Sequence, residues 1–319
     1  MTGRFSEHRI LVTGASGFLG KQFSENLIWE GAEVMGIDRR SPGPGPDNEP
    51  KTVRPQRFVQ GELKDVFDET AEFLASVPVA QRGVFHLAGL ADAHQCQCHP
   101  DFAFASHIET TFSVLEMCRR IGGATLFYPS TGLVYGQSCQ KPVVENSPVI
   151  DDSGSVYVSM KLSAESMIRL YARHYGVGGI IGRLANIYGP GMGDNTIIGR
   201  ILSQVREKKR IRVREMTSVR DFIYSEDVVD AALALFSKPI TESVLIVNIS
   251  TGIGMRLETL VTEASRLFQT EYDPPEECQT TKNDPSHLVL SNEKLKKLTG
   301  WTPKTILTEG LIKSLKDSI

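Results

Sequence analysis

The sequence lacks hydrophobic runs of the length that a membrane requires, since no stretch approaches the roughly 20 apolar residues of a spanning helix. Its start also lacks the long apolar core of a secretion signal. Positive charge is not in excess, because 35 Lys and Arg stand against 38 Asp and Glu. Nucleic acid, whose phosphates require a basic face, is therefore not an expected partner. These absences predict a cytoplasmic protein that binds neither membrane nor nucleic acid.

Cysteines are few and follow no disulfide framework. Five of them are scattered over 319 residues, so reduced thiols are expected. Cys96, Cys98 and His99 are metal-binding residue types, but no second pair of ligands follows at the spacing of a zinc site. The sequence therefore predicts no metal site.

Basic residues gather in one segment, residues 206–214 (REKKRIRVR). From Arg210 onward, charged and apolar residues alternate, which is typical of a strand with one solvated face. Binding of an anionic ligand is the alternative for this segment.

The first part of the chain alternates between short apolar runs and longer amphipathic segments. Helices are predicted at residues 18–30, 66–76, 102–121 and 155–175, and a loop rich in proline and glycine at residues 41–50. Strands are predicted at residues 9–13, 33–38, 57–60, 84–87, 125–128 and 179–183. This order predicts an α/β fold of the Rossmann type, a doubly wound parallel sheet with right-handed crossovers.

A glycine-rich turn, residues 12–20 (VTGASGFLG), joins the first strand to the first helix. Gly14 permits a tight turn, Gly17 lets the backbone approach a pyrophosphate, and Gly20 permits close packing of helix and strand. The free N–H groups at the start of the helix attract phosphates. This turn predicts a dinucleotide site.

The ends of the following strands complete the predicted site. Asp38 ends the second strand, where a carboxylate binds the adenosine ribose and repels a 2′-phosphate, so NAD is predicted. Arg39 and Arg40 leave NADP as the alternative. Residues after the third strand are placed at the adenine edge, and small residues after the fourth let the cofactor approach the chain. The predicted NAD-binding residues are Gly14, Ser16, Gly17, Phe18, Leu19, Asp38, Arg39, Glu62, Leu63, Leu87, Ala88, Gly89, Tyr157 and Lys161.

Two side chains with acid–base chemistry share one face of the helix predicted at residues 155–175. Tyr157 and Lys161 lie one helical turn apart. A phenol with a pKa near 10 is a poor base, but a neighbouring cation favours the phenolate, as does oxidised nicotinamide. Lowering the pKa by about three units takes roughly 4 kcal/mol. We therefore predict that Tyr157 is the general base and acid, and that Lys161 activates it and holds the nicotinamide ribose.

Hydroxyl groups follow the fifth predicted strand, at the carboxyl edge where α/β sheets bind ligands. Thr131 is predicted to hydrogen-bond the substrate oxygen that Tyr157 deprotonates, and Ser130 to contact the substrate. Ordinary turn chemistry is the alternative for Ser130 and Thr131. A tyrosine and a lysine at this spacing also occur by chance on many helices.

With these residues assembled, the chain resembles the extended short-chain dehydrogenase/reductases, in particular the NAD-dependent epimerase/dehydratase family typified by UDP-galactose 4-epimerase. The resemblance covers nearly the whole chain and rests on the motifs TGASGFLG, HLAG, STGLVYG, YVSMK, RLANIYGPG, RDFIYSEDV and GWTP. It implies that Thr131, Tyr157 and Lys161 form the catalytic trio. It also implies that Asn186 and Arg220 face a substrate diphosphate, a role that suits a guanidinium.

The pattern changes after Tyr188, where loops lengthen and prolines gather. We predict an NAD-binding Rossmann domain at residues 1–184, with later segments at about 215–250 interleaving. Residues 185–319 are predicted to form mainly a smaller, mixed substrate-binding domain. By the resemblance, the two long helices pair with a second subunit in a homodimer.

Some positions depart from the family pattern. Gly132 and Leu133 stand where dehydratases of the family carry Asp-Glu, so dehydration is disfavoured. His107 replaces an asparagine that often precedes the long central helix. The arginine of a second diphosphate clamp is not apparent near residues 283–287, which leaves room for a smaller polyol or acid as substrate.

The predicted function is an NAD-dependent nucleotide-sugar epimerase, which oxidises a sugar hydroxyl to a transient ketone and reduces it again. The alternative is an NAD(P)-dependent ketosugar reductase or hydroxyl dehydrogenase with net redox turnover. A non-catalytic nucleotide sensor on this fold is disfavoured, because the complete trio is present. For Arg220, an ion pair with Asp221 or Asp227 is the alternative to phosphate binding.

Overall fold

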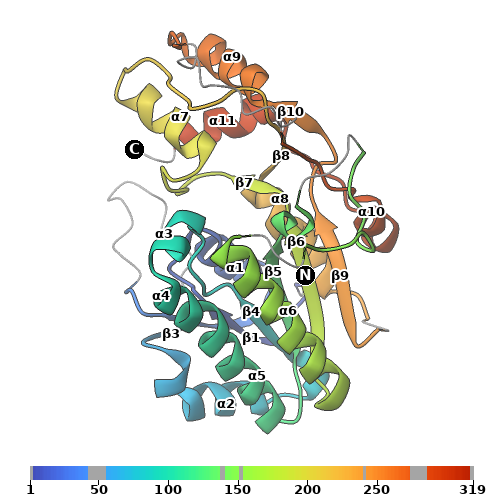
Figure 1. The fold of residues 1–319 in the computed structure, drawn as a ribbon. Helices are drawn as coiled ribbons and strands as arrows, with labels where there is room; N and C mark the ends of the chain where they lie inside the picture. The colour runs from blue at the N-terminus through green and yellow to red at the C-terminus, as the bar shows by residue number, and fades with distance from the viewer. Residues whose placement is uncertain are drawn as a thin grey trace. The chain divides into compact units, whose positions relative to one another are not determined.

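The structure is a computed structural model that describes residues 3–41, 55–136, 141–150, 154–239, 242–273 and 286–316 (Figure 1). Residue contacts divide the chain into two units. The first comprises Met1–Val134, Asp151–Arg183 and Ala232–Val247, and the second comprises Tyr135–Ile150, Leu184–Ala231 and Asn248–Ile319. Cys139, Cys278, residues 283–285 and most of the loop predicted at residues 41–50 lie outside the described residues.

The first unit is built on a seven-stranded sheet with the order β3-β2-β1-β4-β5-β6-β9. Its strands are β1 (Arg9–Thr13), β2 (Glu33–Asp38), β3 (Arg57–Gln60), β4 (Arg82–His86), β5 (Thr125–Thr131), β6 (Gly178–Leu184) and β9 (Val244–Ile249). The pairs from β3 through to β5 are parallel. The order reverses at β1, which lies between β2 and β4, and ligands bind at such switch points. The predicted fold class is confirmed.

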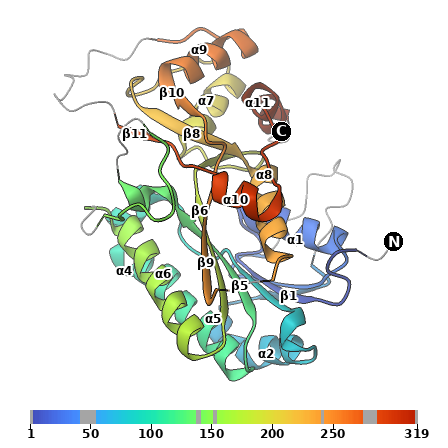
Figure 2. The same cartoon turned by 90° about the vertical axis from the view of Figure 1, so that its right-hand side faces the viewer.

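Helices cover both faces of this sheet, which is why its central strands are apolar along their length. α2 (Phe67–Ala75), α5 (Thr110–Arg120) and α6 (Val156–His174) pack on one face, and α1 (Phe18–Trp29) lies on the other (Figure 2). On the α1 face, the rings of Phe23, Phe85 and Phe127 are buried, with centroids 5.2 to 5.7 Å apart. Burying each ring contributes about 1.5–3 kcal/mol, so this cluster fixes α1, and with it the glycine turn, on the sheet.

The helix predicted at residues 102–121 contains a π-helical turn. α4 (Pro100–Phe104) leads into the turn, Ala105–Glu109, and α5 continues from it. The turn carries His107, whose side chain is 1% exposed. Because π turns often occur at functional sites, this position is a candidate for a role in the site. A short helix, α3 (Ala93–Cys98), precedes α4 and is capped by Asp92.

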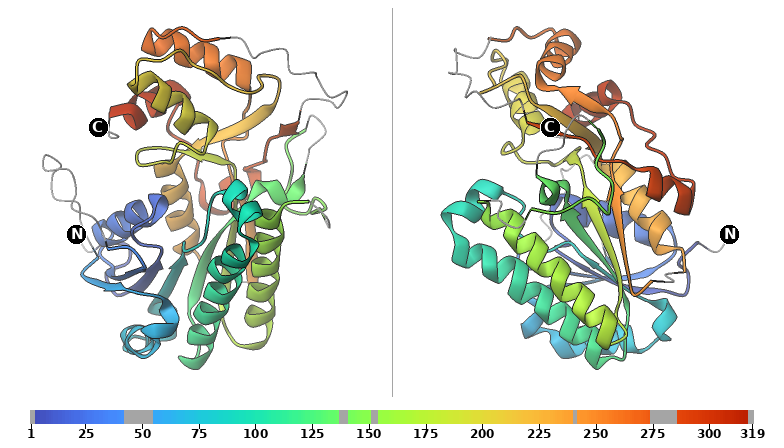
Figure 3. Two further views of the ribbon diagram at one scale, coloured as in Figure 1. Left: turned by 60° about the vertical axis from the view of Figure 1, so that its left-hand side comes forward. Right: turned by 45° about the vertical axis from the view of Figure 1, so that its right-hand side comes forward.

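The second unit has a small mixed sheet. β8 (Val219–Tyr224) pairs with β7 (Asn186–Tyr188) and β11 (His287–Leu288) in parallel, and with β10 (Gly254–Arg256) in antiparallel orientation. α7 (Ile197–Arg206), α9 (Leu257–Phe268) and α11 (Leu307–Lys316) pack together around an apolar core (Figure 3). α8 (Ser225–Phe236) follows β8, and α10 (Glu293–Thr299) follows β11. The predicted mixed architecture is present.

The prediction of a strand from Arg210 onward is wrong. The segment forms a single bridge, between Ile211 and Tyr272, although Ile211 and Val213 are buried and the arginines that alternate with them are exposed, as the pattern predicts. Arg210 pairs with Glu271 and Asp273, and Arg212 also pairs with Asp273. Carboxylates of the chain itself therefore compensate these charges, which disfavours an anionic ligand.

No helix in the described ranges is long and apolar enough to cross a membrane. Within the same ranges, no three His, Cys, Asp or Glu side chains gather in a way that holds a metal ion. Cys96, Cys98 and Cys118 are free thiols.

Candidate active site

The glycine turn between β1 and α1 has a conformation that its three glycines explain separately. Gly14 has a φ of 70°, and a Cβ there would lie 2.8 Å from the backbone nitrogen of Ala88. At Gly20, a Cβ would overlap the carbonyl oxygen of Gly14 and lie 2.8 Å from Cα of Ala15. At Gly17, which has a φ of −78°, a Cβ would contact one atom, the Gly14 oxygen, at 3.0 Å.

Packing of the protein therefore accounts for Gly14 and Gly20, whereas Gly17 keeps the outer side of the turn open. Among the described residues, no side chain caps the N-terminus of α1, so its N–H groups remain available for an anion. This open cradle at a helix N-terminus fits the pyrophosphate of a dinucleotide. The turn of Ser16, Gly17, Phe18 and Leu19 would hold it.

The carboxylate of Asp38 is fixed beside this turn. Its Oδ2 accepts a hydrogen bond from the backbone N–H of Ser16 at 3.0 Å, and its Oδ1 accepts one from the N–H of Arg40 at 2.9 Å. Arg39, by contrast, stacks on the ring of Phe102, with its guanidinium carbon 4.9 Å from the ring centroid. The group nearest the turn is thus an acceptor for ribose hydroxyls, as NAD requires.

Two residues, Glu62 and Leu63, are predicted to lie at the adenine edge. Glu62 forms an ion pair with Lys64 at 2.8 Å, and Leu63, which begins a short 3-10 turn, is 3% exposed. Both residues follow β3, as predicted. Their contact with adenine stays a prediction.

A buried hydrogen-bond chain anchors the residues after β4 next to the glycine turn. His86 contacts Thr13 Oγ1 through Nδ1 at 2.8 Å and Thr111 Oγ1 through Nε2 at 3.0 Å. Burial lowers the pKa of His86 to about 3, so its ring is neutral at physiological pH. Thr13 Oγ1 also accepts from the N–H of Ala88 at 3.2 Å. Leu87, Ala88 and Gly89 are therefore held where the predicted cofactor site needs small residues.

The structure brings the three predicted catalytic residues together. Thr131 ends β5, and its side chain shares a hydrogen bond with Tyr157 of α6. Lys161, one turn further along α6, donates from Nζ to the carbonyl oxygen of Pro129 at 2.9 Å. Its Nζ is 5.8 Å from the ring centroid of Tyr157 and 4.6 Å from that of Tyr128. These groups lie at the carboxyl end of β5, where the doubly wound fold binds ligands.

The prediction that the lysine lowers the phenol's pKa is wrong for the protein residues taken alone. Burial raises the pKa of Tyr157 to about 12, although the hydrogen bond from Thr131 acts in the opposite direction. Burial also lowers the pKa of Lys161 to about 8. Removing both groups from water disfavours the phenolate and the ammonium alike. The phenolate therefore needs the additional positive charge that oxidised nicotinamide carries.

His107 is a site residue whose position the sequence does not reveal. Its ring packs edge-on against Tyr157, with centroids 5.9 Å apart, and its Nε2 contacts the carbonyl oxygen of Leu90 at 2.9 Å. Burial and the charge of Lys161 lower the pKa of His107 to about 4. A Cβ at Gly89 would lie 2.9 Å from this ring. The sequence signal is the replacement of an asparagine by His107, and the structure explains it as packing against Tyr157.

The side chain of Ser130 is directed at Glu165 of α6. It is 3% exposed, and its hydroxyl donates to Glu165 Oε1 at 2.6 Å. A direct substrate contact from Ser130 stays a prediction, but its proton is already committed to a buried carboxylate.

The two predicted diphosphate ligands belong to the second unit. Asn186 is in β7 and pairs in register with Phe222 of β8. Arg220 is in β8, and its guanidinium donates to the carbonyl oxygen of Ser286 at 2.7 Å and to the Ser286 hydroxyl at 2.5 Å. Burial lowers the pKa of Arg220, with Glu215 acting in the opposite direction.

The alternative of an ion pair for Arg220 is wrong. Asp221 accepts hydrogen bonds from Thr251 and Gly252. Asp227 accepts from the backbone N–H groups of residues 304 and 305. Within the described part of the chain, Arg220 forms no ion pair, so its charge is available to an anionic ligand.

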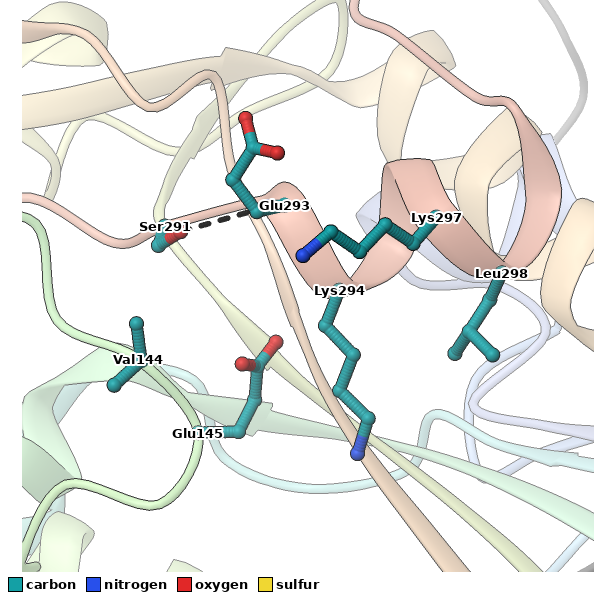
Figure 4. Close-up of a pocket in the computed structure, with 7 residues that line it drawn as sticks. All are labelled: Val144, Glu145, Ser291, Glu293, Lys294, Lys297 and Leu298. Atoms are coloured by element: carbon teal, nitrogen blue, oxygen red, sulfur yellow. Dashed lines mark hydrogen bonds between the residues drawn. The ribbon is translucent and has the colours of Figure 1, made fainter.

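A separate pocket of about 400 Å³ lies within the second unit, and none of the predicted site residues lines it (Figure 4). Glu145, Glu293, Lys294 and Lys297 supply its charged groups. Two carboxylates and two ammonium groups balance one another, so the pocket offers no net charge to select a ligand.

Residues 10–250 match the sequence model of the NAD dependent epimerase/dehydratase family. The chain belongs to this family. The resemblance and the NAD dependence predicted from the sequence are thereby confirmed, and the extended short-chain dehydrogenase/reductase type agrees with the sheet order. The assignment of the glycine turn, Asp38 and the residues after β4 to NAD stays a prediction.

Three relatives are similar to this chain over nearly its whole length. The putative UDP-glucose 4-epimerase of Methanocaldococcus jannaschii is 29% identical, and the alignment covers 95% of this chain and 95% of the relative. The second is the UDP-glucose 4-epimerase of Thermotoga maritima, whose crystal structure was solved with UDP-glucose. Its sequence is 27% identical, and its structure superposes with a TM-score of 0.80 over 97% of this chain and 98% of the Thermotoga chain. The Thermus thermophilus UDP-glucose 4-epimerase complex with NAD is also 27% identical, with a TM-score of 0.78 and coverage of 97% and 98%.

Proposed function

We propose that this family member is an NAD-dependent epimerase that inverts a hydroxyl-bearing carbon of a UDP-linked sugar, with C4 of a hexose as the favoured position. The observation that carries the proposal is the convergence of Thr131, Tyr157 and Lys161 at the carboxyl end of β5, with Nζ of Lys161 5.8 Å from the ring centroid of Tyr157 and 2.9 Å from the carbonyl oxygen of Pro129. This arrangement supplies an acid–base group beside the predicted nicotinamide site. The named relatives with UDP-glucose and with NAD support the substrate class and the cofactor.

The chain's own residues account for the proton in both directions. Bound NAD would supply the hydride acceptor for the sugar carbon and, in the reverse direction, the hydride donor. Tyr157 takes the hydroxyl proton as the ketone forms and returns the same proton when the ketone is reduced, so no proton is gained or lost over the cycle. Thr131 holds the sugar oxygen beside the phenol, and the ammonium of Lys161 would hold the nicotinamide ribose. Holding the reacting groups in one site supplies much of the rate.

Dehydration is not proposed. The residues after Thr131 are Gly132 and Leu133, at the start of a short 3-10 turn, and neither side chain transfers a proton. A turnover that ends with the sugar intact is therefore favoured.

The substrate diphosphate is assigned to Arg220 and Asn186. Replacing Arg220 by glutamine is expected to raise the KM for UDP-glucose about 10- to 100-fold with little change in kcat, because hydrogen bonds to charged groups contribute about 1.5–3 kcal/mol. Steady-state kinetics measure this. The matched control is Arg256→Gln in β10 of the same sheet, whose side chain is exposed, and it should leave KM unchanged. An unchanged KM in the Arg220 variant contradicts the assignment.

A homodimer is proposed on the face formed by α4, the π turn, α5 and α6. Apolar side chains stand exposed there, among them Phe104, Phe112 and Leu170, the last with 53% of its surface accessible. Replacing Leu170 by glutamate is expected to convert the dimer to a monomer, since a charge on an apolar contact loses its hydration on association. Light scattering after gel filtration measures the mass. A wild-type monomer, or a variant that remains dimeric, contradicts the proposed interface.

The cytoplasmic location stays a prediction from composition.

The function is tested by supplying UDP-glucose to the purified protein with NAD. We expect the C4 epimer to form without a net increase in NADH absorbance. Stoichiometric accumulation of NADH instead identifies a dehydrogenase, the alternative activity.

A further inference from the structure

Three residues of α6, each one turn from the next, hold three consecutive residues at the end of β5. Tyr157 shares a hydrogen bond with Thr131. Lys161 donates to the carbonyl oxygen of Pro129 at 2.9 Å. The third member of the series is Glu165, which accepts a hydrogen bond from the hydroxyl of Ser130 at 2.6 Å. The first two belong to the proposed catalytic trio, whereas Glu165 has no role in it.

The carboxylate of Glu165 is buried and fully engaged. Its side chain is 0% exposed, and Arg183 at the end of β6 donates to both of its oxygens, at 3.1 and 2.8 Å. Arg169, one turn further along α6, donates to Oε2 at 2.6 Å. A buried carboxylate persists only when its hydrogen bonds are satisfied, and this one joins β5, β6 and α6.

We propose that Glu165 is a positioning residue of the reaction: it fixes the end of β5, and therefore Thr131, against α6, and its charge supports the ammonium of Lys161. The roles of Thr131 and Lys161 themselves rest on the proposed function. The contacts of Glu165 with Ser130 and Arg183 do not.

The charge of Glu165 matters because of what surrounds Lys161. Burial lowers the pKa of Lys161 to about 8, and Glu165 and Cys96 of α3 act in the opposite direction. The other groups that face it are His86 of β4 and His107 of the π turn, which are neutral, and the rings of Tyr128 and Tyr157. Cys96 is a neutral thiol at physiological pH, because burial raises its pKa, so Glu165 is the permanent negative charge among these groups.

The first experiment replaces Glu165 by glutamine and follows Lys161 directly. In protein with isotope-labelled lysine, the Lys161 resonance is assigned by its loss in Lys161→Met and titrated by NMR. Its pKa is expected to fall by about one unit in Glu165→Gln, because the favourable charge is removed. Since the charged lysine is lost as pH rises through this pKa, the alkaline limb of the pH profile of kcat moves to lower pH by a similar amount.

The matched control is Glu116→Gln. Glu116 lies in the same unit and also binds an arginine and a hydroxyl, those of Arg119 and Tyr171. The Glu116→Gln variant should leave the pKa of Lys161 unchanged. An unchanged Lys161 pKa in Glu165→Gln overturns the proposal. Should that variant not fold, Ser130→Ala, which leaves Glu165 and both of its arginine partners in place, still tests the positioning role.

The second experiment separates position from charge. Ser130→Ala removes the bond to β5 and keeps Glu165 ionised. The expected result is a kcat about tenfold lower, with KM and the Lys161 pKa unchanged, because Thr131 is displaced from Tyr157. A raised KM with kcat intact identifies Ser130 as a substrate ligand instead and overturns its positioning role. The NMR titration is independent of turnover, so a protein without epimerase activity fails the proposed function but still tests Glu165.

Discussion

Replacing Tyr157 by phenylalanine is expected to lower kcat about 1,000-fold while leaving NAD binding intact. The substitution removes one oxygen, the atom that shares a hydrogen bond with Thr131 and that is assigned the proton transfer. A positioned acid–base group contributes about 10²–10⁴-fold to rate, so loss of the hydroxyl removes most of the turnover. The ring, and its packing against His107, remains.

The measurement compares kcat with the NAD dissociation constant in the same preparation. Tyr171→Phe is the matched control, because Tyr171 is also a buried tyrosine of α6 but its hydroxyl donates to Glu116 at 2.7 Å. The control should retain full activity. A Tyr157→Phe protein that turns over at the wild-type rate refutes the assigned base.

Gly20→Ala is expected to lower stability, whereas Gly17→Ala is expected to lower NAD affinity. At Gly20 the added Cβ collides with the backbone of Gly14 and Ala15, so the free energy of unfolding should fall by about 2–3 kcal/mol. At Gly17 the added Cβ touches one protein atom, so stability should change little, while the methyl group occupies the open side of the turn. NAD affinity is expected to fall about tenfold or more in Gly17→Ala.

Denaturant unfolding without ligand, followed by NAD titration, distinguishes the two variants. The pair acts as its own control, because each substitution adds the same methyl group to the same turn. Loss of stability in Gly17→Ala with normal NAD affinity would show that the outer side of the turn is packed by protein and is not the pyrophosphate cradle.

Much of the first unit follows from the sequence. β1, β2 and β3 have their predicted bounds, because each is a short run of strand-forming residues closed by turn or charged residues. The strand predicted at residues 84–87 begins earlier in the structure, at Arg82, and ends at His86. β5 continues to Thr131, past the predicted end at 128, although its last residues include proline and hydroxyl side chains.

The site follows from the sequence as far as each residue's chemistry depends on its own element. The helical spacing of Tyr157 and Lys161 and the glycine turn are local features. The bonds of Ser130 with Glu165 and of Glu165 with Arg183 join separate elements, and no local pattern indicates them. The raised pKa of Tyr157 has the same origin, since burial outweighs the hydrogen bond from Thr131. The π turn at His107 likewise depends on packing rather than on propensity.

The most direct test of the account is a crystal structure of the protein with NAD and a UDP-sugar. The account predicts the pyrophosphate of NAD at the turn formed by Gly14, Gly17 and the start of α1. It also predicts the Tyr157 hydroxyl between the nicotinamide ring and a hydroxyl of the sugar. A dinucleotide bound elsewhere, or a Tyr157 oxygen directed away from the nicotinamide, contradicts it.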